Sequence, residues 1–159
     1  MAKFLMTELV DVSEVESARL GAGTGPANVL SDKEVGKYVK LVAESRYDLA
    51  VVGNEIEARI SSVEAATMDG YSFGGVNSEG RFAVTFDGLQ GTPGTGVIAV
   101  GDYVVVGTPV AKGTALTAPP RVCKATAAAN TLNFKWRVVS LGAVGTGAVS
   151  TTGVIDFIG

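Results

Sequence analysis

Three carboxylates are the residues of this chain that are best suited to acid–base chemistry. Glu55 and Glu57 are two residues apart, and Asp69 follows in a turn-rich segment. Paired carboxylates can act as general acid and base in glycoside hydrolysis, or they can bind a cation. Residues 55–60, however, alternate strictly between charged and apolar side chains, which predicts a strand with Ile56, Ala58 and Ile60 inward. We therefore interpret the two glutamates as charges on a solvated strand face.

Histidine is absent from the 159 residues. Its absence excludes Ser-His-Asp and Cys-His nucleophiles, histidine zinc sites and the usual neutral-pH general base. The glycine-rich loop 91–96 lacks the Gly-Lys-Ser/Thr ending that holds nucleotide phosphates. The single cysteine, Cys123, lies in an apolar run and is predicted to be a small core residue. We expect no catalytic residue, no cofactor, no metal and no enzymatic activity.

The composition is poor in charge and rich in small residues. Apolar residues make up 47% of the chain and charged residues only 18%, with 21 glycines and a net charge of −3. Residues 1–80 hold 7 basic and 13 acidic residues, whereas residues 81–159 hold 6 and 3. The cations of the second half are scattered, so we expect no nucleic-acid partner. Such a low-charge surface favours a protein that works within an assembly.

Membrane and export signals are also missing from the sequence. No apolar run approaches the ~18 residues of a transmembrane helix. The first residues, MAKFLMTE, have too short an apolar core for a secretory signal. We expect no membrane partner, synthesis in a cytoplasm and one sizeable core, since a chain of this length can bury one.

The N-terminal region is predicted to contain an arm and one helix. We assign residues 1–30 to an arm and linker, because Gly21–Pro26 holds three glycines and a proline. Ser31 and Glu34 form a capping box, and Val35, Tyr38, Val39 and Val42 recur at helical spacing. This pattern predicts a helix at about 32–45, with Gly36 as its weak point.

The rest of the chain reads as strands, so that residues 31–159 form a single β domain with the helix leading it. Within 96–113, three short apolar runs separated by glycine steps predict two or three closely spaced antiparallel strands. Trp136 is expected to be a large core or interface anchor. The fold class is mainly β: an antiparallel jelly-roll-like sandwich or small barrel with an N-terminal arm and one short helix. The predicted strands lie near residues 54–67, 81–86, 96–113, 121–125, 133–141 and 154–158.

Segment order and texture over Asn54–Gly159 resemble the capsid decoration (cement) proteins of tailed bacteriophages. The segments that carry the resemblance are EIEARISSVEAA, GVIAVGDYVVVGTPVAKGTAL, RVCKAT, FKWRVVSLGA and GVIDFI. The resemblance implies a jelly-roll-like or barrel-like domain on the outer surface of an icosahedral virion. It also implies a homotrimer that binds the major capsid protein and ties neighbouring capsid subunits together, without catalytic residues.

An arm that adds contact area must overcome an ordering cost of about 1–2 kcal/mol per residue, so it needs apolar anchors. The candidates for contact with the capsid or a neighbouring copy are Phe4, Leu5, Leu9, Val10 and Val12. The alternative function is a receptor- or glycan-binding β module of a phage head fibre or appendage, with an aromatic surface of Tyr71, Phe73 and Trp136. A carboxylate-based glycosidase and a structural protein unrelated to virions are further readings.

Overall fold

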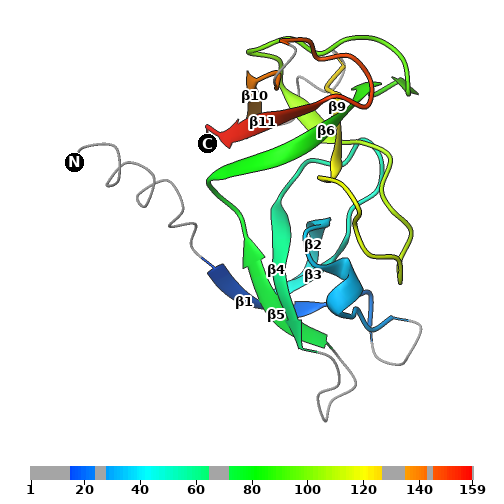
Figure 1. Cartoon of the computed structure of the whole chain (residues 1–159). Coiled ribbons are helices and arrows are strands. Elements are labelled where there is room, and N and C mark those ends of the chain that lie inside the picture. The colour runs from blue at the N-terminus through cyan, green and yellow to red at the C-terminus, as the bar shows by residue number, and fades with distance from the viewer. Residues whose placement is uncertain (1–14, 24–27, 65–71, 127–134, 143–144, 159) are drawn as a thin grey trace, which may run out of the picture.

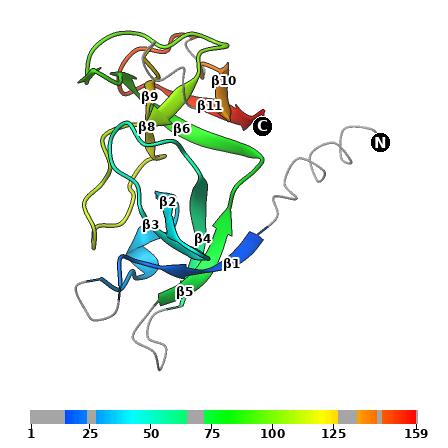
Figure 2. The ribbon, with the colours of Figure 1, turned by 180° about the vertical axis from the view of Figure 1, so that it is seen from behind.

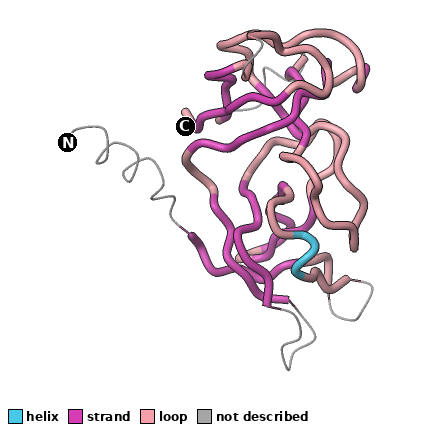
Figure 3. Tube along the Cα trace, in the orientation of Figure 1, coloured by secondary structure: helices cyan, strands magenta, loops and turns pink. Residues whose placement is uncertain are grey.

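A computed structural model of the chain describes residues 15–23, 28–64, 72–126, 135–142 and 145–158. Figures 1 and 2 show two β units, one above the other, and Figure 3 shows the short helical turn at 32–34 among strands and loops. The elements are β1 Val15–Leu20, η1 Asp32–Glu34, β2 Tyr38–Ala43, β3 Arg46–Leu49, β4 Ala58–Glu64, β5 Ser72–Asn77, β6 Arg81–Leu89, β7 Thr92–Pro93, β8 Val104–Val106, β9 Arg121–Lys124, β10 Trp136–Ser140 and β11 Thr152–Phe157. The predicted mainly β class is confirmed.

The first unit is a closed barrel with the strand order β1-β3-β2-β4-β5. β1 closes it by pairing antiparallel with β5 and parallel with β3. Alternate side chains of each strand point inward, as the period of a strand requires. Together with Leu30 from the segment before η1, they form a core cluster within the barrel: Ala18, Leu20, Leu30, Val39, Tyr47, Ala58, Ile60 and Val76. β4 and β5 approach so closely at Gly74 that a Cβ there would lie 2.0 Å from the Ser62 carbonyl oxygen.

The second unit is a six-stranded sheet with the order β10-β11-β6-β9-β8, in which β7 also pairs with β6. Its centre is the long strand β6, where Phe82, Val84 and Phe86 are buried on one face as the alternation predicts. The two outer strands come together through a bridge between Tyr103 and Arg137. The Gly101 N–H donates to the Val138 carbonyl at 2.9 Å, which continues this contact. The second sheet therefore curls until its edges meet.

The two units share a core at their junction. A second cluster joins residues of the sheet to Tyr38, Ala50 and Ile56 of the first unit. Trp136 is 1% exposed, stacks on Phe82 at 4.7 Å between ring centroids, and donates from Nε1 to the Ile56 carbonyl at 2.7 Å. The expected anchor role of Trp136 is thus a core role, and it links the sheet to the barrel.

The predicted helix at 32–45 is wrong. The capping box forms, but only the turn η1 follows it, and residues 38–49 make the hairpin of β2 and β3. The helical turn ends at Val35, which has a ψ of 132°, and Gly36 follows with a φ of +90°. Tyr38 and Val39 are both buried, on opposite faces of β2. The adjacent Tyr38 and Val39 are both buried because one face of β2 fills the barrel and the other meets the second sheet, whereas Val35 and Val42, which completed the helical spacing, are each 39% exposed.

Two further boundaries differ from the expectation. Residues 15–20 of the expected arm and linker form the barrel strand β1. In the predicted strand cluster at 96–113, only β8 is a strand, and its three valines are buried. The other apolar runs there are loops, with Val97 and Val100 about 60% exposed. Among the described residues, no helix has the length and apolar character needed to cross a membrane.

Candidate functional site

The two carboxylates Glu55 and Glu57 line a groove of about 300 Å³ between the barrel and the second sheet, together with Glu16 and Lys135. Glu57 accepts a hydrogen bond from the Leu41 N–H, and Glu16 accepts one from the Tyr47 hydroxyl at 3.5 Å. Burial and the charges of Glu16 and Glu57 raise the pKa of Tyr47. Glu57 is exposed, as predicted, and contacts the backbone of β2, but it precedes β4 rather than lying on it. The prediction is wrong for Glu55, which is half-buried and has one buried carboxylate oxygen without a partner in the described structure.

The groove does not gather the other predicted chemical groups. Asp69 and Tyr71 lie outside the described residues. Within the described ranges, no three acidic or cysteine side chains are placed to hold a metal ion. Cys123 is fully buried, as expected, and burial raises the pKa of its thiol to about 11.

The aromatic surface proposed for glycan binding is not formed as expected. Trp136 is buried in the core, whereas Phe73 lies on β5 of the barrel with the Arg19 guanidinium 5.9 Å from its ring centroid. A side chain that is 1% exposed cannot stack on a sugar ring. The arm candidates Phe4, Leu5, Leu9, Val10 and Val12 also lie outside the described residues.

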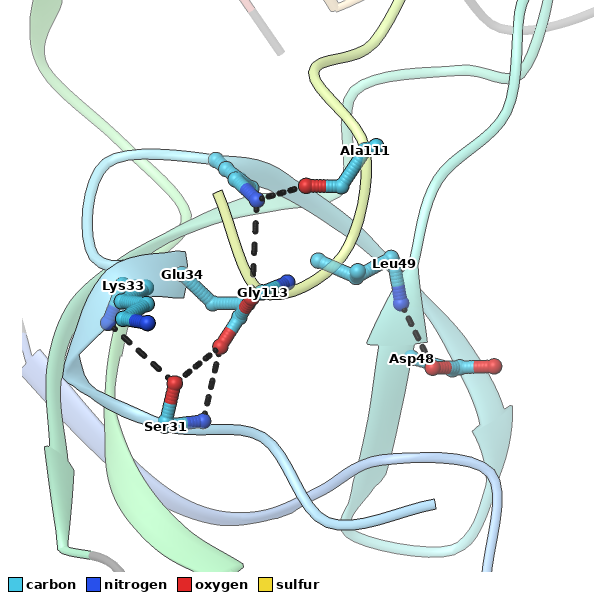
Figure 4. Close-up of polar contacts among 8 residues, drawn as sticks. Ser31, Lys33, Glu34, Asp48, Leu49, Ala111 and Gly113 are labelled. Atoms are coloured by element: carbon cyan, nitrogen blue, oxygen red, sulfur yellow. Dashed lines mark hydrogen bonds and ion pairs between the residues drawn. The ribbon is translucent and has the colours of Figure 1, made fainter. Parts of the chain in front are cut away.

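The structure reveals a polar cluster around Glu34 that joins the two units (Figure 4). Glu34 is 1% exposed and accepts hydrogen bonds from Ser31, through its N–H at 2.7 Å and its hydroxyl at 2.8 Å. Its other oxygen accepts from the Gly113 N–H. Lys37, 5% exposed, lies 3.5 Å from Glu34 and donates to the Ala111 carbonyl at 2.9 Å.

Burial by itself would raise the pKa of Glu34. The hydrogen bonds from Gly113 and Ser31 and the charge of Lys37 outweigh that effect, so the pKa of Glu34 is lowered. The carboxylate is therefore held in its charged form. The sequence predicts the Ser31–Glu34 contact from local spacing, but no local signal points to Gly113, which is distant in the chain.

A second buried carboxylate, Asp87 of β6, also accepts a hydrogen bond from the loop between β8 and β9, but from the side of the second sheet. It accepts from the Arg121 guanidinium at 2.8 Å and from the Thr108 N–H at 2.7 Å. Burial opposes its charged form, but the bonds to Thr108 and Arg121 lower the pKa of Asp87. The strand predicted near residues 81–86 stops short of Asp87, whereas β6 continues through this residue to Leu89.

Both carboxylates hold one long loop, residues 107–120, which we call the strap. It leaves β8, passes alongside the barrel near η1 and returns to β9, as the yellow-green trace in Figures 1 and 2 shows. Its base is closed by a hydrogen bond from the Gly107 N–H to the Arg121 carbonyl at 2.9 Å. Thr108 is bound to Asp87, and Gly113 is bound to Glu34.

Beneath the strap is a cavity of about 170 Å³. Its walls come from the barrel (Tyr38, Leu49), from the sheet (Val106) and from the strap (Val110, Leu116). Ligand sites form preferentially at such junctions between structural units. This partly open cavity lies at the junction of the two units, beside the polar contacts of Lys37 and Arg121.

No protein-family model matches this chain, and neither a curated protein nor a solved structure shows significant similarity to it.

Proposed function

We propose that this chain is a structural virion protein that binds the outer surface of an icosahedral phage capsid. It bridges neighbouring major capsid subunits as a homotrimer and thereby stabilises the shell. The jelly-roll-like arrangement and the N-terminal arm that the sequence resemblance implies are part of this proposal. Its support is the character of the exposed surface together with the segment resemblance.

The observation that carries the proposal is a rigid, exposed apolar loop at residues 97–103. Val97, Val100 and Tyr103 are 61%, 60% and 43% exposed. The loop backbone is nevertheless fixed, because Ile98 between them is fully buried. Exposed apolar side chains on a preorganised backbone are typical of protein-contact surfaces, since little ordering entropy is lost on binding.

Three backbone contacts hold this loop. The Ile98 N–H donates to the Gly147 carbonyl at 3.0 Å, and the Gly101 N–H donates to the Val138 carbonyl at 2.9 Å. Within the loop, Asp102 accepts from the Ala99 N–H at 2.8 Å. These contacts explain how three apolar side chains remain in solvent without the loop collapsing onto the core.

The closure of both β units favours side-chain contacts over strand addition. The barrel is closed, and the outer strands of the second sheet meet at Tyr103 and Arg137. A protein that adds a strand to a partner needs an open edge. We therefore expect the capsid to be contacted through loop side chains.

The proposal is tested with purified protein and capsids assembled without it. We expect saturable, stoichiometric binding, and a trimer by light scattering. Val97→Ser combined with Val100→Ser should reduce capsid occupancy at least tenfold while the melting temperature stays nearly unchanged, because exposed substitutions have small effects on stability. The matched control is Val51→Ser with Val52→Ser, two valines that are exposed elsewhere. A strict monomer without affinity for any capsid contradicts the proposal.

The arm is tested separately by deleting residues 1–13, which leaves β1 intact. If Phe4, Leu5, Leu9, Val10 and Val12 contact the capsid or a neighbouring copy, occupancy should fall at an unchanged melting temperature. Full occupancy of the truncated protein would remove the arm from the proposal. A specific hit on a glycan array, in the absence of capsid binding, would instead favour the receptor-binding alternative.

A further inference from the structure

The groove of about 300 Å³ between the barrel and the second sheet carries a net negative charge. Its described walls hold three carboxylates and one ammonium group, from Glu16, Glu55, Glu57 and Lys135. Burial and the charges of Glu16 and Glu57 raise the pKa of Tyr47, another wall residue, so the electrostatic potential in the groove is negative. A partly enclosed surface of one sign attracts a cation, because water screens charge less there than at an open surface.

The groove also has an apolar rim. Leu41 of β2 lines it and is 49% exposed, whereas the adjacent Val42 is exposed but is not one of its walls. Covering a half-exposed leucine removes apolar surface from water, which is favourable. The volume of the groove is at the lower end of the range for ligand sites, so it admits a few side chains. It therefore fits a short segment that combines a positive charge with apolar side chains.

The chain supplies such a segment before β1. Residues 3–6 have the sequence KFLM, one lysine followed by three apolar residues, and the next charged residue is Glu8. They belong to the fourteen residues that precede Val15, all outside the described residues. Charge complementarity therefore matches residues 3–6 to the groove.

The stretch between this segment and β1 favours the groove of another copy over that of the same chain. Glu16 forms a wall of the groove, so the chain enters β1 beside it. Docking in the same chain's groove would require residues 7–14 to turn back, which would hold their three acidic side chains close to the groove carboxylates. Fully extended, these eight residues span at most about 26–29 Å, which is enough to reach a copy packed alongside.

We propose that residues 3–6 of one copy bind in the groove of a neighbouring copy, with the Lys3 ammonium group facing the groove carboxylates and the apolar side chains covering Leu41. This interface rests on the proposed homotrimer but not on capsid binding. Because each copy gives its segment to the next, three copies close a ring around a threefold axis. The apolar loop at 97–103, which contributes no wall of the groove, stays available for the capsid.

The contact is measured on the full chain with a nitroxide spin label attached at Ala2→Cys. The native Cys123 is fully buried, so the label reacts at the introduced thiol. Spin-labelled copies without isotopes are mixed with isotope-labelled copies that carry no spin label. We expect the strongest NMR broadening at the Leu41 methyl groups of the isotope-labelled copies, and its disappearance when the nitroxide is reduced.

A charge exchange tests how the segment is recognised. Lys3→Glu and Glu57→Lys should each weaken association by about fivefold per contact, hence by about a hundredfold for the three contacts of a trimer. The double variant should restore trimer formation. The matched control is Glu44→Lys, an exposed glutamate that does not line the groove, and it should leave association unchanged. Light scattering over a concentration series measures all four variants.

The apolar contribution is tested at two adjacent residues of β2. Leu41→Ser should weaken trimer formation, because the segment loses its apolar contact at the rim. Val42→Ser, exposed but outside the groove, should form trimers like the unmodified protein.

Three outcomes would overturn the proposal while capsid binding, measured separately, still stands. They are a trimer without broadening at Leu41 in mixed samples, broadening only when spin label and isotope are on the same copy, and no recovery in the double charge exchange. If Glu57→Lys does not fold, the spin-label result decides. A protein that is monomeric at every concentration overturns this interface together with the homotrimer. A trimer with the expected broadening but no affinity for capsids refutes the proposed function and leaves the interface in place.

Discussion

The barrel and the second sheet differ in how each completes its core. All members of the barrel cluster come from residues 18–76, so the barrel fills its interior with its own side chains. The cluster of the second sheet instead takes in Tyr38, Ala50 and Ile56 from the first unit. The sheet also closes through a loop bridge at Tyr103, whereas the barrel closes through a six-residue strand pairing of β1 with β5. The barrel is the self-sufficient unit, and the sheet depends on it.

This asymmetry follows the division of charge along the chain. The barrel lies within the acidic residues 1–80, and the sheet lies within the mildly basic residues 81–159. The direct polar links between the units run through Glu34, Lys37 and the strap, through the Trp136 indole and the Ile56 carbonyl, and through backbone hydrogen bonds that join Val106 to Gly53 and Asn54. The two units carry net charges of opposite sign, but the junction between them consists mainly of apolar packing and a few buried polar contacts.

The largest expected effect comes from separating the two units. A fragment of residues 1–78 should retain β structure and unfold cooperatively, because its core cluster is internal. A fragment of residues 79–159 should remain unfolded alone, since Tyr38, Ala50 and Ile56 are missing from its core. Circular dichroism of each fragment and of their mixture measures this. Cooperative unfolding of the C-terminal fragment alone would show that the sheet does not depend on the barrel.

Truncating Trp136, which links the units, should lower the free energy of unfolding substantially, but less than separating the two units does. Trp136→Ala should destabilise the protein by about 3–5 kcal/mol, the range for large aromatic truncations in a core. It also leaves the Ile56 carbonyl without its donor. Urea unfolding measures the change in the free energy of unfolding. The matched control, Val97→Ala at an exposed position, should stay within about 0.5 kcal/mol.

The two buried carboxylates should affect different parts of the strap. Glu34→Gln should increase hydrogen exchange at the Gly113 amide, and Asp87→Asn should do so at Thr108, each at a cost of about 1.5–3 kcal/mol for charged hydrogen bonds. Hydrogen exchange by NMR resolves the two positions. Loss of protection along the whole strap in either variant would mean that the strap detaches as one unit.

Acid should weaken the hydrogen bonds of Glu34 and Asp87. The free energy of unfolding should change little near neutral pH and fall at acidic pH. Both carboxyl groups have lowered pKa values, so their contribution is fully present above their ordinary values of 4.5 and 3.8. It is lost as the pH falls through the lowered values, because the unfolded chain then binds more protons. We expect stability to be nearly flat from pH 7 to about 5 and to fall below about pH 4. In Glu34→Gln the loss of unfolding free energy on acidification should be smaller than in the unmodified protein. If the two pH profiles are identical, other groups cause the loss.

The alternation of apolar and polar residues predicts those strands that have one face in the core and the other in solvent. In residues 56–60 the alternating side chains are buried as expected, and β6 buries Phe82, Val84 and Phe86. The pattern fails where a strand is covered on both faces. Tyr38 faces the second sheet while Val39 faces the barrel interior, so both are buried and the strand period disappears. The capping box then favoured a helix that ends after one turn at Val35.

The candidate site was less accessible to sequence reasoning than the fold. Tyr38 and Leu116 reach the same cavity from segments far apart in the chain, and Glu34 meets Gly113 across a separation of 79 residues. Spacing arguments identify groups that are neighbours along one element, such as Ser31 and Glu34. They cannot identify which loop returns to cover them.

The sequence by itself determined the mainly β class, the buried cysteine and the exposed Glu57 beside an inward-facing Ile56 and Ala58, because composition and alternation act over a few residues. The tertiary structure alone decided the barrel closure, the strap and the cavity beneath it. These features depend on long-range pairing and on which faces become buried against each other, and a single strand or loop carries no local signal of its distant partner.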